Sequence, residues 1–146
     1  MSKYSDRAER LFENGYNCSQ AVFCAFAEDL GFTEDQAARV SIGLGGGVGR
    51  MREVCGAITG SAMVVGLAKP EYDKAKVYET VREIAAEFKK CHSTIVCKEL
   101  LELKTINHNE LPEPRTAEYY SKRPCLKIVR DAALATEKIL FSKESE

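Results

Sequence analysis

The chain has 146 residues, of which 45% are hydrophobic and 29% charged, a composition typical of one soluble domain, 1–146, with an apolar core. Its net charge of −1 gives no broad attraction to nucleic acid, and we expect no membrane span. Segment 1–10 is polar and lacks the apolar run of a signal peptide, so we expect a cytoplasmic protein. Because thiols stay reduced there, the six cysteines favour metal or redox chemistry over structural disulfides.

Helical periodicity covers most of the chain, and no convincing alternating strand occurs. The first part predicts three helices, 5–14, 18–30 and 34–42. Asn17 is a good N-cap for the second of them, and Thr33 with Gln36 forms a capping box that opens the third. The glycine-rich stretch 43–50 then predicts a sharp turn or a close approach of two backbones. Anion binding by its N–H groups is the weaker alternative.

The stretch Glu53–Leu67, EVCGAITGSAMVVGL, predicts a nearly uncharged helix at the centre of the fold. Its apolar residues occur on all sides, which is typical of a buried helix. Two pairs of small residues are spaced four apart, Gly56 with Gly60 and Ala62 with Gly66. Because glycine in a helix costs about 1 kcal/mol relative to alanine, both pairs predict close packing against neighbouring helices.

The remaining part of the chain predicts three more helices. A long helix covers 71–92, and a short one follows the caps Ser93 and Thr94 and runs to about Leu103. The last helix covers 124–141. Between the last two lies a long stretch, 104–119, without a clear period. Such loops are often functional, and we expect this one to pass near the site and change its order with the redox state. The chain therefore predicts a compact all-α bundle of about six or seven helices around the central helix 53–67.

Four cysteines fall in the first turns of predicted helices: Cys18, Cys55, Cys97 and Cys125. The N–H groups and the dipole at a helix start stabilise a thiolate, so we expect all four thiols to ionise readily. Cys24 lies in mid-helix and Cys91 lies on the apolar stripe of helix 71–92. We expect both to be buried and inert, since a buried cysteine behaves as a small hydrophobe.

Cysteines from four separate helices predict one shared redox or metal site, although no C-x-x-C pair is present. Three forms remain open: an iron–sulfur cluster, a metal-free thiol–disulfide pair in which Cys55 attacks, and a structural zinc site. Nearby cations would offset the thiolate charge: Arg50, Arg52, Lys98 and Arg123. His92 is expected to be exposed at a helix end, and neither His92 nor His108 is expected to be a metal ligand.

The same residues resemble the C_GCAxxG_C_C family of redox-active proteins. Its C-G-A-x-x-G motif is residues 55–60 here, while 17–22 looks like its first cysteine region and 45–50 like its glycine loop. Cys97 and Cys125 match the last two cysteines of the family. The candidate contacts to a cofactor are the glycines of both motifs: Gly45, Gly46, Gly47, Gly56 and Gly60.

The resemblance implies redox activity as the class of function. From the four cysteines, Cys18, Cys55, Cys97 and Cys125, the leading hypothesis is electron transfer or redox sensing with a redox partner protein. A related domain in an electron-transfer cytochrome is joined to c-type haem segments, but this chain has no C-x-x-C-H for covalent haem. Whether the chain forms a homodimer, and whether it is an enzyme, stay open at this point.

Overall fold

The computed structural model describes residues 2–103 and 124–141. Within these residues every named secondary-structure element is a helix. The α-helices are α1 (Lys3–Glu13), α2 (Cys18–Ala27), α3 (Glu34–Ser41), α4 (Gly56–Ala68), α5 (Lys74–His92), α6 (Cys97–Leu100) and α8 (Cys125–Leu140). Two 3₁₀ turns, η1 (Glu28–Leu30) and η2 (Ile42–Leu44), follow α2 and α3. The predicted all-α class is confirmed. The stretch 104–119 and His108 lie outside the described residues.

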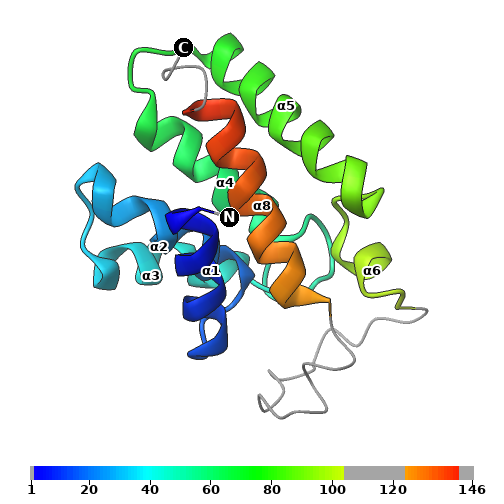
Figure 1. The fold of residues 1–146 in the computed structure, drawn as a ribbon. Coiled ribbons are helices and arrows are strands. Elements are labelled where there is room, and N and C mark those ends of the chain that lie inside the picture. Colours follow the sequence, from blue (N-terminus) through cyan, green and yellow to red (C-terminus); the bar gives the residue numbers. More distant parts are fainter. Residues whose placement is uncertain (1, 104–123, 142–146) are drawn as a thin grey trace.

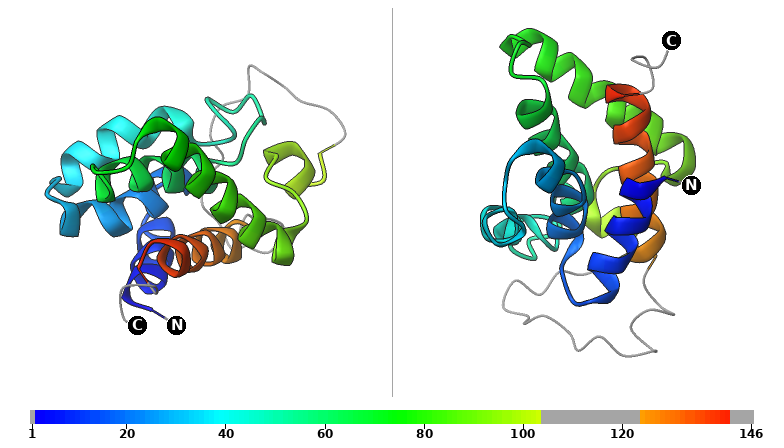
Figure 2. Two further views of the ribbon diagram at one scale, coloured as in Figure 1. Left: turned by 90° about the horizontal axis from the view of Figure 1, so that it is seen from above. Right: turned by 60° about the vertical axis from the view of Figure 1, so that its left-hand side comes forward.

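Helices α2 and α4 form the interior of the domain and pack directly on each other. Helices α1 and α8 cover one face of this pair as a second layer, while α3 packs beside α2 (Figures 1 and 2). Helix α5 packs against both α4 and α8. Nine of the ten residues of α2 are buried, which fits a helix that contacts α1, α3, α4 and α8. None of the described helices is long and apolar enough to cross a membrane.

Capping explains why α2 and α3 begin where the sequence predicts, whereas α1 begins two residues before its predicted start because Ser2 caps it. The Asn17 side chain accepts the N–H of Gln20 at 3.0 Å, and the Gln20 side chain accepts the N–H of Asn17 at 3.0 Å. Thr33 and Gln36 form the same reciprocal box at the start of α3. Each box satisfies two backbone donors that a helix start otherwise leaves without a partner.

Helix α4 begins at Gly56, three residues later than the predicted start at Glu53. The preceding residues are extended instead, because Val54 forms an isolated antiparallel bridge with Val96. The Cys55 N–H donates to the carbonyl of Ile95 at 2.7 Å in the same pairing. Cys55 is therefore the N-cap of α4 rather than a residue of its first turn.

Two later helices also begin after their predicted starts. Helix α5 begins at Lys74 rather than at 71, because the Asp73 side chain caps it by accepting the N–H of Lys76 at 2.8 Å. Helix α6 has only four residues, and the predicted caps do not cap it. Ser93 ends α5 in a left-handed conformation, and Thr94 accepts the N–H of Val96 at 3.1 Å.

The close approach of α4 to α2 depends on two glycines. A Cβ atom on Gly56 would lie 3.0 Å from the backbone nitrogen of Ser19, and one on Gly60 would lie 2.9 Å from the Ser19 carbonyl oxygen. The predicted packing role of this pair is confirmed. The prediction for Gly66 is wrong, because Gly66 is exposed and a Cβ there would meet nothing within 4 Å.

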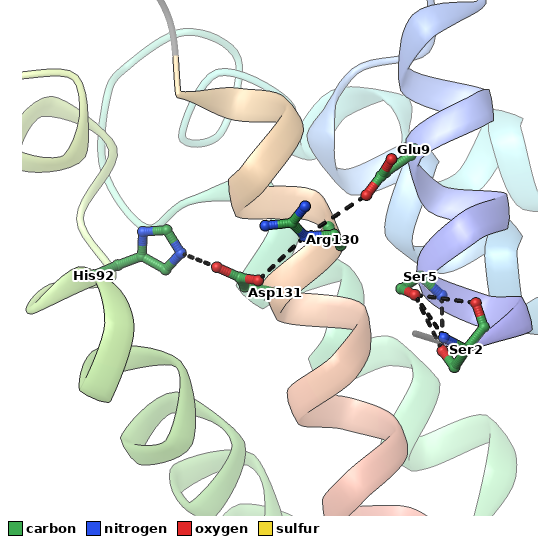
Figure 3. A network of polar contacts seen from close by, with 6 residues as sticks. All are labelled: Ser2, Ser5, Glu9, His92, Arg130 and Asp131. Carbon is green, nitrogen blue, oxygen red and sulfur yellow. Dashed lines mark hydrogen bonds and ion pairs between the residues drawn. The ribbon is translucent and has the colours of Figure 1, made fainter.

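A polar network holds α8 between α5 and α1 (Figure 3). The Nε2 atom of His92 lies 2.8 Å from Oδ2 of Asp131, and the Arg130 guanidinium pairs with both Asp131 and Glu9 at 3.6 Å. The His92 ring also stacks on Phe88, and its side chain is only 10% exposed. The expectation that His92 is exposed is therefore wrong, because the last turn of α5 packs against α8.

Candidate functional site

The four predicted cysteines line one cavity of about 550 Å³. Cys18, Cys97 and Cys125 are the first residues of α2, α6 and α8, and Cys55 caps α4. Gly45, Gly46, Gly47 and Gly56 line the same cavity, whereas Gly60 lies against α2 and is not part of the lining.

Three of the thiols are near neighbours. The Cys18 thiol lies within hydrogen-bonding reach of both Cys55 and Cys125. The residues Cys55, Cys97 and Cys125 are only 5–8% exposed, and the Cys18 sulfur is enclosed by its neighbours although the residue is partly exposed. No disulfide joins the six cysteines. The site is therefore a recessed group of reduced thiols.

Ionisation distinguishes Cys55 from the other thiols. A hydrogen bond from the Cys18 thiol lowers the pKa of Cys55, and the N–H groups of Ala57 and Ile58 at the start of α4 act in the same direction. Hydrogen bonds to Cys125 and Cys55, together with burial, raise the pKa of Cys18 well above its ordinary value. Cys55 is thus the more readily ionised of the two thiols, and Cys18 is the less readily ionised thiol that donates to it.

The expectation that all four thiols ionise readily is wrong for Cys18 and Cys97. Burial raises the pKa of Cys97, although the Arg52 guanidinium donates to its sulfur at 3.6 Å. Helix α6 has only four residues, so its dipole is small. Burial and crowding of the thiols therefore outweigh placement at a helix start.

The glycine loop brings the cysteine-bearing segments together. A Cβ atom on Gly47 would lie 2.7 Å from the Cβ of Cys97 and 2.6 Å from the backbone nitrogen of Glu53. A Cβ atom on Gly45 would overlap the side chain of Asn17, the residue before Cys18. Gly47 also has a φ of 70°, which side chains rarely adopt. These glycines are required for close approach, in agreement with the predicted tight connection.

The loop after these glycines continues in left-handed backbone geometry. Val48, Arg50 and Arg52 have φ values of 65°, 62° and 63°, which is uncommon for residues other than glycine. The N–H of Arg52 donates to the carbonyl of Gly46 at 3.0 Å and the N–H of Glu53 to that of Gly47 at 2.9 Å. This turn directs Arg50 and Arg52 to the cavity wall.

Arg52 is more important to the site than sequence reasoning indicated. Arg52 is only 6% exposed, and its Nη1 atom donates to the sulfur of Cys97. The sequence identified it only as one of four nearby cations. Of the others, Arg50 lines the cavity, Lys98 is exposed and is not part of the lining, and Arg123 lies outside the described residues. No sequence signal distinguishes the buried arginine from the exposed lysine.

The other two cysteines lie away from the cavity. Cys24 is buried in the core as predicted, and burial together with the charge of Glu34 raises its pKa to about 11. The prediction of burial for Cys91 is wrong, since Cys91 is exposed. The inward position at the end of α5 is taken by His92, which packs against α8 through Asp131.

Alkylation should distinguish these two cysteines. At about pH 8, iodoacetamide is expected to modify Cys91 rapidly and to leave Cys24 unmodified while the protein is folded, because the reagent needs an accessible thiolate. Peptide mass spectrometry after short exposure measures both rates. Equal modification of Cys24 and Cys91 in the folded protein would contradict the burial described for Cys24.

The fold and the site together define a small all-α protein in which four helix starts surround a cysteine-lined cavity. The chain belongs to the C_GCAxxG_C_C family, described as "Putative redox-active protein", whose family model matches residues 16–139. All four cavity cysteines fall within the matched residues. A search of curated proteins and a search of solved structures each returned no significant match.

Proposed function

We propose that this protein is a thiol redox protein in which Cys18, Cys55, Cys97 and Cys125 form one site and Cys55 is the attacking thiolate. The observation that carries the proposal is the contact of the Cys18 thiol with Cys55 and Cys125 at the cavity wall. The opposite pKa shifts of Cys55 and Cys18 support an attacking thiolate beside a neutral thiol. The family description supports redox activity as the class.

In the proposed reaction, the Cys55 thiolate attacks one sulfur of a substrate disulfide and breaks its S–S bond. A mixed disulfide forms on Cys55, and the first substrate half leaves as a thiolate that takes up the proton of Cys18. The Cys18 thiolate then attacks the Cys55 sulfur and releases the second half as a thiolate. Two electrons pass to the substrate, and a Cys18–Cys55 disulfide remains. A redox partner protein would reduce that disulfide again.

Cys125 is the alternative resolving thiol, because its charge acts on Cys55 and both thiols neighbour Cys18. Cys97 has a different environment, with a guanidinium as the donor to its sulfur. We therefore assign Cys97 to holding Arg52 at the cavity wall rather than to the first exchange step.

An iron–sulfur cluster is the second candidate, favoured by four thiols around one cavity and by the cationic Arg50 and Arg52 beside them. Four cysteine thiolates are the donor set such clusters use, and a bound cluster would supply one-electron transfer. A single zinc ion fits less well. Tetrahedral zinc with Zn–S distances of about 2.3 Å needs sulfurs about 3.8 Å apart. No three cysteine, histidine or acidic side chains in the described residues converge to hold one ion.

Cofactor analysis separates these candidates. Protein purified without oxygen is expected to be colourless, to contain no stoichiometric iron, sulfide or zinc, and to lose two titratable thiols on treatment with one equivalent of diamide. Reduction should restore both thiols, because disulfide formation is reversible. Visible absorbance with stoichiometric iron and sulfide would overturn the thiol–disulfide proposal in favour of the cluster. Stoichiometric zinc would overturn it in favour of a structural metal site.

A further inference from the structure

We infer that the cavity beside Cys55 selects a small disulfide that carries carboxylate groups, in preference to neutral or cationic disulfides. The inference rests on the proposed thiol–disulfide function and adds the class of its substrate. It is carried by the depth of the thiols, the two arginines on the cavity wall and the apolar side chains that also line the cavity.

The recessed position of the thiols favours a small substrate. Cys55 and Cys125 are 5% and 8% exposed, and both line the cavity of about 550 Å³. That volume lies in the range of small-molecule sites, roughly 300–1,000 Å³. The disulfide of a folded protein is attached to two backbone segments, and these would have to enter the cavity for its sulfur to reach Cys55. A free disulfide of a few carbon atoms needs no such opening.

The charge of the wall favours an anion. Arg50 and Arg52 line the cavity, and no aspartate or glutamate occurs among the described residues that line it. The chain as a whole carries a net charge of −1, so the pair of cations is a local feature of the cavity. Charges of one sign along a low-dielectric cleft concentrate oppositely charged ligands there.

Arg52 would hold the anion close to the thiols. Arg52 is only 6% exposed, and its guanidinium contacts the sulfur of Cys97. Coulomb interactions are stronger at a buried group than in bulk water, so a carboxylate near Arg52 gains more than it would at the surface. A guanidinium also presents several donors in a plane that matches a carboxylate. A short substrate held there would have its S–S bond near the cysteine group.

The rest of the wall accommodates a carbon skeleton. Phe12, Leu100, Leu101 and Ile128 line the cavity together with the thiols. Apolar side chains with a few polar groups that fix orientation are typical of small-ligand sites. The expected ligand is therefore a short aliphatic disulfide with at least one terminal carboxylate.

Three short disulfides with different end groups test this selection: dithiodiglycolate, bis(2-hydroxyethyl) disulfide and cystamine, which are anionic, neutral and cationic. The rate of each with the reduced protein is divided by its rate with 2-mercaptoethanol, which corrects for intrinsic reactivity. We expect the corrected rate to be at least about tenfold higher for the anionic than for the cationic disulfide. The ratio should fall as salt is added, because ions screen the attraction.

Two variants test whether a cavity arginine causes the preference for the anionic disulfide. Arg50→Gln should lower the ratio of the anionic to the cationic rate severalfold, because it removes one of the two cavity cations and leaves Arg52. Lys98→Gln is the matched control, since it removes an exposed cation of α6 that does not line the cavity. It should leave the ratio unchanged. A ratio that falls equally in both variants would contradict selection by the cavity.

Adipate provides a measurement that needs no redox reaction. It has the six-atom chain of dithiodiglycolate but no S–S bond, so it should slow the alkylation of Cys55 and raise the melting temperature, while 1,6-hexanediol should do neither. Equal corrected rates for the three disulfides and no effect of adipate would overturn the inference. Failure to reduce even the neutral disulfide, with protection by adipate intact, would instead overturn the thiol–disulfide function and leave the anion site standing.

Discussion

Replacement of Cys55 by serine should abolish the reduction of small disulfides, lowering the rate by roughly a thousandfold or more. A serine hydroxyl is not ionised near neutral pH and cannot form the mixed disulfide. Cys91→Ser is the matched control, because Cys91 is exposed in the last turn of α5, does not line the cavity and should be dispensable. The rate with bis(2-hydroxyethyl) disulfide measures both variants.

The other cavity cysteines should lose function in different ways. In Cys18→Ser the first step remains and only Cys125 is left to resolve the mixed disulfide, so the adduct on Cys55 should last longer. In Cys18→Ser/Cys125→Ser it should be stable and visible by intact mass. Cys24→Ala should keep full activity and lose only on the order of 1 kcal/mol of stability for a small core truncation. Loss of activity in Cys24→Ala or Cys91→Ser comparable to that in Cys55→Ser would contradict a site confined to the cavity.

Opposite changes in stability are expected for two glycine-to-alanine replacements in α4. Alanine is the better helix former by about 1 kcal/mol, which favours both variants. In Gly60→Ala the new methyl would lie 2.9 Å from the Ser19 carbonyl oxygen, so α2 and α4 must separate. Overpacking of this kind costs about 1–3 kcal/mol and should also move Cys55 away from Cys18.

Gly66→Ala is the control, because its methyl meets nothing within 4 Å. It should raise the free energy of unfolding by up to about 1 kcal/mol. Urea unfolding of both variants, together with their rates of disulfide reduction, measures the effect. Stabilisation by Gly60→Ala with unchanged activity would contradict the account of how the two thiols are brought together.

Much of the fold could be predicted because its signals are local. Asn17 and the pair Thr33–Gln36 cap helices through side chains only three residues away, so the sequence alone locates those starts. The pairing of Gly56 with Gly60 likewise predicted the close contact with α2. Features that depend on distant partners were less predictable. Helix α4 starts late because Val54 pairs with Val96, more than forty residues away.

The candidate site shows the same division. Placement at helix starts identified the four cysteines that line the cavity, but it could not predict their ionisation. The pKa of Cys18 depends on contact with Cys55 and Cys125, and that of Cys97 on burial. Periodicity also could not predict which side chain packs inward at the end of α5. That side chain is His92, and its partner Asp131 lies on α8.

Disulfide mapping after mild oxidation tests the central claim, that Cys55 and a neighbouring cavity thiol form the redox pair. Reduced protein is treated with one equivalent of diamide, quenched in acid, digested and analysed by mass spectrometry. We expect one intramolecular disulfide from Cys55 to Cys18, or to Cys125 when Cys18 is replaced by serine, with Cys24 and Cys91 unlinked. A Cys55 that remains a thiol while Cys91 forms intermolecular disulfides would contradict it.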